Sequence, residues 1–202
     1  AATAYVGRKE GYLTGAIIVD HGLQDGSAEV AEHAAQQARR AGLYTVHVEK
    51  VTVGRDGGLE AAARRARYEA IEVRVDAEGG LNPVVLTGHT MDDQAETVLL
   101  ALARGSGARA LSGIPARRGR IVRPFLSVRR KDTVATCEAL GLEPWHDPTN
   151  LDPDGPRRSA LRASVMPALV DVLGPGVVSG LARSAALLQA DADELEDHLR
   201  GQ

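Results

Sequence analysis

The chain has 202 residues, of which 44% are hydrophobic and only 3% aromatic, and its formal net charge is −3. This length fits one domain, or a domain with a small appendage, whose core is built from aliphatic side chains. The single cysteine, Cys137, excludes an internal disulfide or a cysteine cluster for a metal. No apolar run reaches the ~18 residues of a membrane span, and no signal peptide is visible. We therefore expect a cytoplasmic protein without a membrane partner.

Strands and helices alternate in the first half of the chain. In chain order, we predict a strand at 16–19, a helix from the capping residue Ser27 to about Ala41, a strand at 44–48, a helix at 59–75, a strand at 83–86 and a helix at 92–104. Such alternation predicts an α/β protein with a parallel sheet and helical crossovers. Residues 1–11 look like the end of a helix, so the first strand and a phosphate-binding loop are expected upstream of them.

The pattern changes after residue 113. We predict a short strand at 121–126, interrupted by Pro124, then a helix at 132–140, a turn-rich loop at 147–156, a helical stretch that starts at Ser159 and breaks at Pro167, and a last helix at 177–200. The turn-rich loop suggests a division into an α/β domain, 1–146, and a helical appendage, 147–202.

Basic residues are concentrated in the middle of the chain. Residues 104–162 contain 12 Lys or Arg against 6 Asp or Glu, although the whole chain is acidic. This excess indicates a phosphate-binding surface, while an ordinary solvated surface explains it about as well. Within it, Arg158 and Arg162 have the i, i+4 spacing of one helix face, which together with Arg123 points to an anionic partner.

Three acids occupy the first turn of the helix predicted at 92–104. Asp92, Asp93 and Glu96 follow Gly88-His89 at the carboxyl end of a strand, where ligands bind in open parallel sheets. The acids could simply cap backbone N–H groups, which are favourable sites for carboxylates. They could also bind Mg²⁺, through Asp92 or Asp93, or accept a proton from an attacking amine.

Other candidate positions lie at strand and helix ends. Asp20 and His21 close the first visible strand, where they either line a ligand site or bond to the local backbone. Arg67 lies on an Arg-rich helix and suits a phosphate or carboxylate. Gly105 and Gly107 either end a helix or form a loop that contacts a nucleotide.

These segments in series resemble the tRNA(Ile)-lysidine synthases, a branch of the PP-loop ATP pyrophosphatases. The similar motifs, in order along residues 17–169, are VDHGL (19–23), EAAARRARY (60–68), GHTMDDQAET (88–97), RGSG (104–107), IVRPF (121–125) and DPTN (147–150). The resemblance implies a Rossmann-like parallel sheet of the PP-loop type with a C-terminal helical appendage.

The resemblance also implies a reaction. Such enzymes use ATP and Mg²⁺ to adenylate the wobble cytidine of a tRNA(Ile) with a CAU anticodon, and free L-lysine then displaces AMP to form lysidine. Asp93 would hold the lysine ammonium and take its proton, and Arg67 would place the activated base or its phosphate, with Asp92 and Glu96 in support. By the same resemblance, the nucleotide would contact Asp20, His21, Gly88, His89, Gly105 and Gly107, and the tRNA would contact Arg123, Arg158 and Arg162; a homodimer is a possible assembly.

The chain also departs from the family pattern. The nucleotide loop Ser-Gly-Gly-x-Asp-Ser is absent from these residues, and so are the family's C-terminal tRNA-binding domains. Gln24, Thr90 and Ser159 stand where Arg, His and Asn are common. The rival predictions are another PP-loop tRNA-modifying enzyme, such as a thiolase, an amidating synthetase, or a non-catalytic nucleotide-binding module of the universal-stress type.

Overall fold

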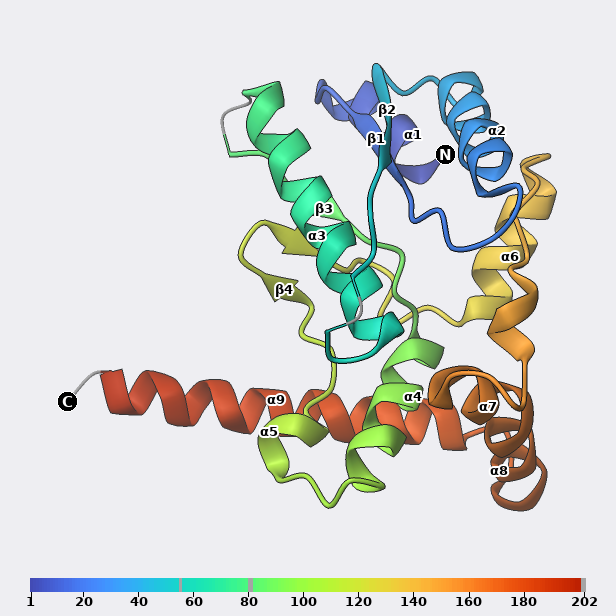
Figure 1. The fold of residues 1–202 in the computed structure, drawn as a ribbon. Helices are drawn as coiled ribbons and strands as arrows, with labels where there is room; N and C mark the ends of the chain where they lie inside the picture. Colours follow the sequence, from blue (N-terminus) through green and yellow to red (C-terminus); the bar gives the residue numbers. More distant parts are fainter. Residues whose placement is uncertain (55, 80–81, 201–202) are drawn as a thin grey trace. The chain divides into compact units, whose positions relative to one another are not determined.

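The computed structural model describes residues 1–54, 56–79 and 82–200 and divides the chain into two compact units. Unit 1 comprises Ala1–Pro83 and unit 2 comprises Val84–Gln202. The ribbon of each unit can be followed by its colours in Figure 1.

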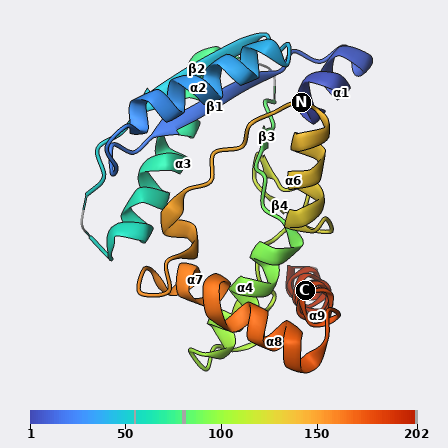
Figure 2. The same cartoon turned by 90° about the vertical axis from the view of Figure 1, so that its right-hand side faces the viewer.

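Unit 1 is built around two parallel strands joined by a helical crossover. Its elements are α1 (Ala2–Glu10), β1 (Gly15–Asp20), α2 (Ser27–Arg40), β2 (Thr45–Lys50) and α3 (Leu59–Glu78). β1 pairs with β2 in register from Gly15 opposite Thr45 to Asp20 opposite Lys50. Helix α2 packs against both strands, as Figure 2 also shows, and α3 packs against β1. The small side chains of Ala31 and Ala35 are buried, which lets α2 approach the strands closely.

Unit 2 has a small mixed sheet and a larger helical part. β3 pairs in parallel with β5, and β5 pairs in antiparallel fashion with β4. The elements are β3 (Val85–Leu86), α4 (Met91–Leu102), α5 (Ala108–Leu111), β4 (Arg117–Arg118), β5 (Ile121–Val122), α6 (Arg130–Ala139), η1 (Pro148–Leu151), α7 (Arg157–Ala160), η2 (Leu161–Val165), α8 (Met166–Leu173) and α9 (Val177–Arg200).

Helix α4 forms the centre of unit 2. The long helix α9 packs along α4 and α5, and the ribbon shows it passing both helices (Figure 1). Ala95, Val98 and Ala101 of α4 are buried, as are Val178 and Ala185 of α9. These side chains are small or β-branched, so the two helix backbones come close together, and the packing fixes the position of the polar first turn of α4.

The α/β class, the parallel pairing and the C-terminal helices are confirmed. Three local predictions were wrong. Ser27 is the first helical residue of α2 and Gly26 is its N-cap. The strand predicted at 121–126 ends at Val122, because the chain turns so that the N–H of Val128 bonds to Phe125 O. Pro167 does not end the helical stretch: it lies in the first turn of α8, which follows the π-helical η2 directly, and the chain stays helical from Arg157 to Leu173.

The residues after 147 belong to unit 2, in which α7, η2 and α8 lead into α9. The division of the chain at residue 147 stays a prediction. Among the described residues no single helix has the length and apolar character of a membrane span. Two consecutive helical segments, Arg157–Leu173 and Val177–Leu199, have the length and apolar composition of a membrane span when taken together, but the chain bends by 99° between them.

Candidate active site

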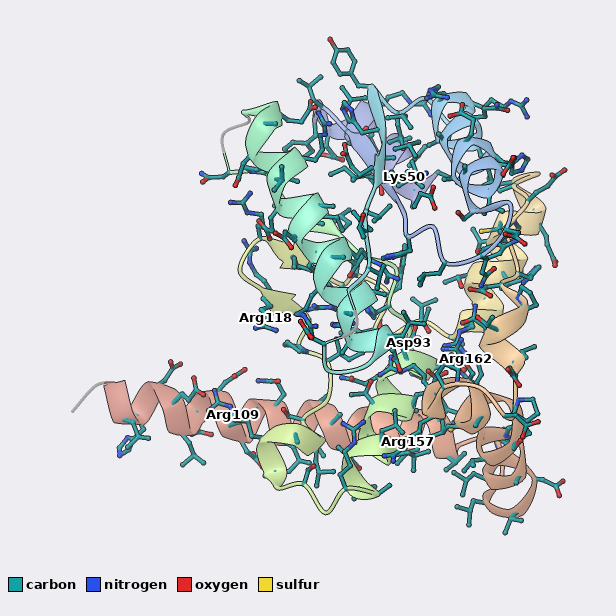
Figure 3. The ribbon with its side chains drawn as sticks, in the orientation of Figure 1. Lys50, Asp93, Arg109, Arg118, Arg157 and Arg162 are labelled. Atoms are coloured by element: carbon teal, nitrogen blue, oxygen red, sulfur yellow. The ribbon has the colours of Figure 1, made fainter. Side chains whose placement is uncertain are left out.

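The first turn of α4 is held by a capping box. Thr90, the N-cap, donates its backbone N–H and its hydroxyl to Asp93 Oδ2, at 2.8 and 2.7 Å. The other carboxylate oxygen of Asp93 accepts from Arg130 Nη2 at 2.9 Å and lies 3.5 Å from Arg162 Nη2. Figure 3 shows Asp93 and Arg162 near each other at the start of α4. One oxygen of Asp93 therefore has a local structural role, and the other faces two cations.

Asp92 joins α4 to α6. It accepts from Arg129 Nη2 at 3.0 Å and Arg129 Nε at 3.1 Å, and from the backbone N–H of Arg130 at 2.7 Å. Since Arg130 is the first residue of α6, Asp92 supplies a carboxylate to one of the N–H groups that a helix start leaves unpaired. The N–H of Met91 also donates to Val128 O at 2.9 Å, so the starts of the two helices are bonded together.

Glu96 is a buried carboxylate, only 1% exposed. Arg162 donates to both of its oxygens in a bidentate pair, with Nε to Oε1 and Nη2 to Oε2 at 2.9 Å each. Arg130 Nη2 donates to Oε1, also at 2.9 Å. Arg162 further donates to Asn150 Oδ1 at 3.1 Å, so Glu96 and Arg162 together connect α4 with η1 and η2. Burial of this charge is tolerable because two guanidinium groups pair with it.

Two further polar residues of the same turns bind neighbouring segments. Gln94 donates to Ile114 O and accepts from the N–H of Ile114, at 3.1 and 2.6 Å. The hydroxyl of Thr97 donates to Asp93 O and accepts from Arg158 Nη2 at 3.2 Å. The motif read from the sequence as an acidic helix start is thus a hub that anchors the loop after α5, as well as α6, α7 and η2.

We call the six charged residues at this hub the acid–arginine cluster: Asp92, Asp93, Glu96, Arg129, Arg130 and Arg162. Three carboxylates and three guanidinium groups give it a formal charge of zero. Burial alone would raise the pKa of Asp93, but the hydrogen bonds from Thr90 and the charges of Arg130 and Arg162 outweigh burial and hold it below its ordinary value. Likewise, Arg129 and the Arg130 N–H outweigh burial and lower the pKa of Asp92.

The donor set of this cluster does not fit a magnesium ion as it stands. The oxygens of Asp92 and Asp93 accept from guanidinium groups, which an ion that needs several oxygen ligands, such as Mg²⁺, would have to displace. Within residues 1–54, 56–79 and 82–200, no group of three or more His, Cys, Asp or Glu side chains is arranged to hold a metal.

Acid is expected to weaken this cluster only at low pH. Because the folded-state pKa values of Asp92 and Asp93 are lowered, their stabilisation is complete above the unfolded pKa and is lost as the pH falls through the folded values. These two residues should make the urea midpoint fall below about pH 4. Asp92→Asn should make that fall shallower, and a fall as steep in Asp92→Asn as in the wild type would contradict this assignment.

Unit 1 brings together three of the predicted site residues. Asp20 is buried at the end of β1, and its Oδ1 accepts from the N–H of Gly22 at 2.9 Å. That bond and one from the Ser27 hydroxyl lower its pKa. Arg67 of α3 donates through Nε to His21 Nε2 at 3.3 Å, which requires a neutral His21. Burial and the charge of Arg67 lower the pKa of His21 in agreement with that pairing.

The glycines predicted to contact a nucleotide, Gly88, Gly105 and Gly107, lie at turns of unit 2. Gly105 has φ +64° just after α4, where the N–H of Ser106 returns to Ala101 O, and Gly107 is the N-cap of α5. Gly88 precedes α4, and His89 Nδ1 lies 2.9 Å from the Thr87 hydroxyl. The described contacts account for Gly105 as a helix end; contact of these residues with a nucleotide stays a prediction.

The arginines predicted to contact tRNA have internal partners. Arg123 is only 4% exposed and donates to Pro115 O at 2.7 Å. Arg158 and Arg162 bind Thr97 and Glu96 of α4. Sequence reasoning did not select Arg129 and Arg130 as site residues. The signal was available: three acids in one helix turn need cations nearby, and the local basic excess includes both arginines.

Comparison with known proteins supplies the family. Residues 1–169 match the model of the PP-loop domain family. Curated tRNA(Ile)-lysidine synthases are similar over nearly the whole chain: the protein of Salinispora tropica is 53% identical over 98% of this chain and 60% of its own length, and that of Thermobifida fusca is 51% identical over 96% and 59%. The chain therefore spans about 60% of the length of these relatives.

A solved structure shares the fold. The U34-tRNA thiolase NcsA from Methanococcus maripaludis aligns with 87% of this chain and 62% of its own, with a TM-score of 0.63 and 17% sequence identity. At this low sequence identity, the match shows a similar fold and nothing about function. The parallel strand pairing, the match over residues 1–169 and the identities near 50% agree, and the chain belongs to the PP-loop domain family, within which its curated relatives are tRNA(Ile)-lysidine synthases.

Proposed function

We propose that the protein ligates L-lysine to the wobble cytidine of tRNA(Ile) with a CAU anticodon, in a reaction driven by ATP. The observation that carries the proposal is the identity of 51–53% with tRNA(Ile)-lysidine synthases over 96–98% of the chain. At this level the hub residues of α4 belong to an aligned segment, so their chemistry is expected to be that of the relatives' enzyme.

The proposed reaction has two steps. The cytosine carbonyl oxygen attacks the α-phosphate of ATP, which releases diphosphate and converts that oxygen into a good leaving group. The ε-amine of lysine then attacks the ring carbon, the amine loses its proton, and AMP departs. The lysine ammonium has a pKa of about 10.4, so the site must stabilise the ammonium and later accept a proton.

Asp93 is our candidate for the lysine-binding carboxylate. One of its oxygens is directed away from its cap, and its lowered pKa keeps it ionised near neutral pH. A carboxylate with a lowered pKa holds an ammonium well but is a weak proton acceptor, so these contacts support binding of the amine more than removal of its proton. Asp92 and Glu96 act in this proposal by holding the arginines and helices around Asp93.

The nucleotide and the activated base are assigned to the other predicted residues. We assign Asp20, His21, Gly88, His89, Gly105 and Gly107 to the nucleotide and Arg67 to the activated base or its phosphate. The pairing of Arg67 with His21 supports a common role for these two residues. We further propose that ATP is used as its magnesium complex, with the ion held mainly by phosphate oxygens and water, which is usual for Mg²⁺.

Recognition of tRNA is assigned to Arg158 and Arg162, with Arg123 in an indirect role. Arg123 is buried and holds the segment at Pro115, so its contribution would come through the loop that it fixes. Such a substrate implies a cytoplasmic site of action. A homodimer stays a prediction.

The proposal is tested by lysine incorporation. The purified protein is incubated with ATP, labelled L-lysine and a tRNA(Ile) transcript with a CAU anticodon, and label in the tRNA is measured. Incorporation that requires ATP and fails with a GAU-anticodon transcript is the expected result. Absence of label with the CAU transcript under conditions in which a curated relative is active would refute the proposal.

A further inference from the structure

Arg130 contacts all three carboxylates of the α4 turn. Its backbone N–H donates to Asp92 at 2.7 Å, and its Nη2 donates to both Asp93 Oδ1 and Glu96 Oε1 at 2.9 Å. The side chain is 32% exposed, so it lies where the buried Glu96 meets the accessible edge of the cluster. A single planar donor group shared by two carboxylates fixes the orientation of both.

The side chain of Arg130 can be changed without removing the supports of this turn. In any variant the backbone N–H at position 130 still donates to Asp92. Asp93 keeps both hydrogen bonds from Thr90, and Glu96 keeps its bidentate pair with Arg162. A change of the side chain removes the hydrogen bond to Asp93 Oδ1, and the remaining cationic neighbour of that oxygen, Arg162 Nη2, is 3.5 Å away.

We propose that Arg130 is a positioning residue for lysine transfer: its guanidinium fixes the carboxylate of Asp93 toward the amine and offsets part of the negative charge that the lysine ammonium meets. This inference rests on the proposed function. The Arg130 side chain then has two effects, one on the orientation of Asp93 and one on the charge of the cluster. The orientation of Asp93 favours reaction, whereas the positive charge of Arg130 opposes binding of the cationic substrate.

The test is the steady-state kinetics of Arg130→Gln in the purified protein, with lysine as the varied substrate. Removal of the guanidinium leaves the cluster with a formal charge of −1, so the KM for lysine should fall about fivefold. Because Asp93 Oδ1 loses its hydrogen bond from Arg130 and the carboxylate is held only through Oδ2, kcat should fall at least about tenfold. A loss of folded protein would lower the apparent kcat and leave the KM for lysine unchanged, so a fall of both parameters distinguishes a role at the site from a loss of folded protein.

Two further variants complete the experiment. Arg130→Lys restores the charge and should return the KM for lysine to the wild-type value while kcat recovers only in part, since an ammonium lacks the planar guanidinium. Arg183→Gln, an exposed residue of α9, makes the same charge change away from the cluster and should alter neither parameter.

The outcomes distinguish this inference from the function on which it rests. If the wild-type protein is active and the Arg130→Gln variant keeps the wild-type kcat, or has an unchanged or raised KM for lysine, the role proposed for Arg130 is overturned alone. A wild-type protein that incorporates no lysine overturns both.

Discussion

Asp93→Asn is expected to reduce lysine incorporation at least about 100-fold while the protein stays folded. Asparagine keeps an oxygen that can accept from the Thr90 N–H, so the cap of α4 survives. The substitution removes one negative charge, and the cluster becomes formally positive beside Arg130 and Arg162. A positive site repels the lysine ammonium, so the second step of the reaction is affected most.

The measurement separates the two steps. Release of diphosphate from ATP with tRNA present and lysine absent should persist in Asp93→Asn, whereas label from lysine should not appear in the tRNA. Asp191→Asn, an exposed residue of α9, is the matched control and should retain both activities. Wild-type turnover in Asp93→Asn would remove Asp93 from the proposed mechanism. Loss of diphosphate release together with loss of lysine incorporation would assign Asp93 a role in the first step.

Glu96→Gln is expected to lower the free energy of unfolding by about 3–5 kcal/mol. The glutamine side chain has nearly the same volume but carries no charge, so Arg130 and Arg162 would share a buried neutral partner in place of a carboxylate. The amide nitrogen would also direct its hydrogens at a guanidinium donor. Such a loss is a large part of the roughly 5–15 kcal/mol that stabilises a typical domain.

Urea unfolding followed by circular dichroism measures this effect. Glu194→Gln, an exposed position on α9, makes the same chemical change in solvent and should stay within about 0.5 kcal/mol of the wild type. Loss of less than about 1 kcal/mol in Glu96→Gln would mean that the buried ion pairs contribute little to folding.

The local features of α4 could be predicted from the sequence because their causes are local. The spacing of Ala95, Val98 and Leu99 predicts a helix, and the polar run before them predicts its start. The structure confirms the helix and buries Ala95 and Val98. The alternation of strands and helices in residues 15–78 was predictable for the same reason, since each element has its own periodicity.

The partners of the acidic turn could not be predicted from the same pattern. Asp92 meets Arg129 and Glu96 meets Arg162, which are 37 and 66 residues away along the chain. A sequence reports how many charges a segment holds but not which of them are used up within the fold. The basic excess at 104–162 was therefore interpreted as a surface for phosphate, although several of its arginines pair with carboxylates or carbonyl oxygens of unit 2.

The helix after the turn-rich loop shows another limit. Arg158 and Arg162 were placed on one face by α-helical spacing, but Arg162 lies in η2, a π-helical stretch, which is wider than an α-helix. A pattern that assumes 3.6 residues per turn has no means of detecting that change. The two side chains nevertheless reach neighbouring residues of α4, Thr97 and Glu96.

The even balance of three acids and three arginines constrains how this protein can evolve. A substitution that removes Glu96 leaves two cations facing each other, and one that removes Arg162 leaves a buried anion with a single partner. Each intermediate is expected to be less stable than the starting protein, because a buried charge that remains has lost a partner. Positions 96 and 162 are therefore expected to change together, from one charge-balanced pair to another.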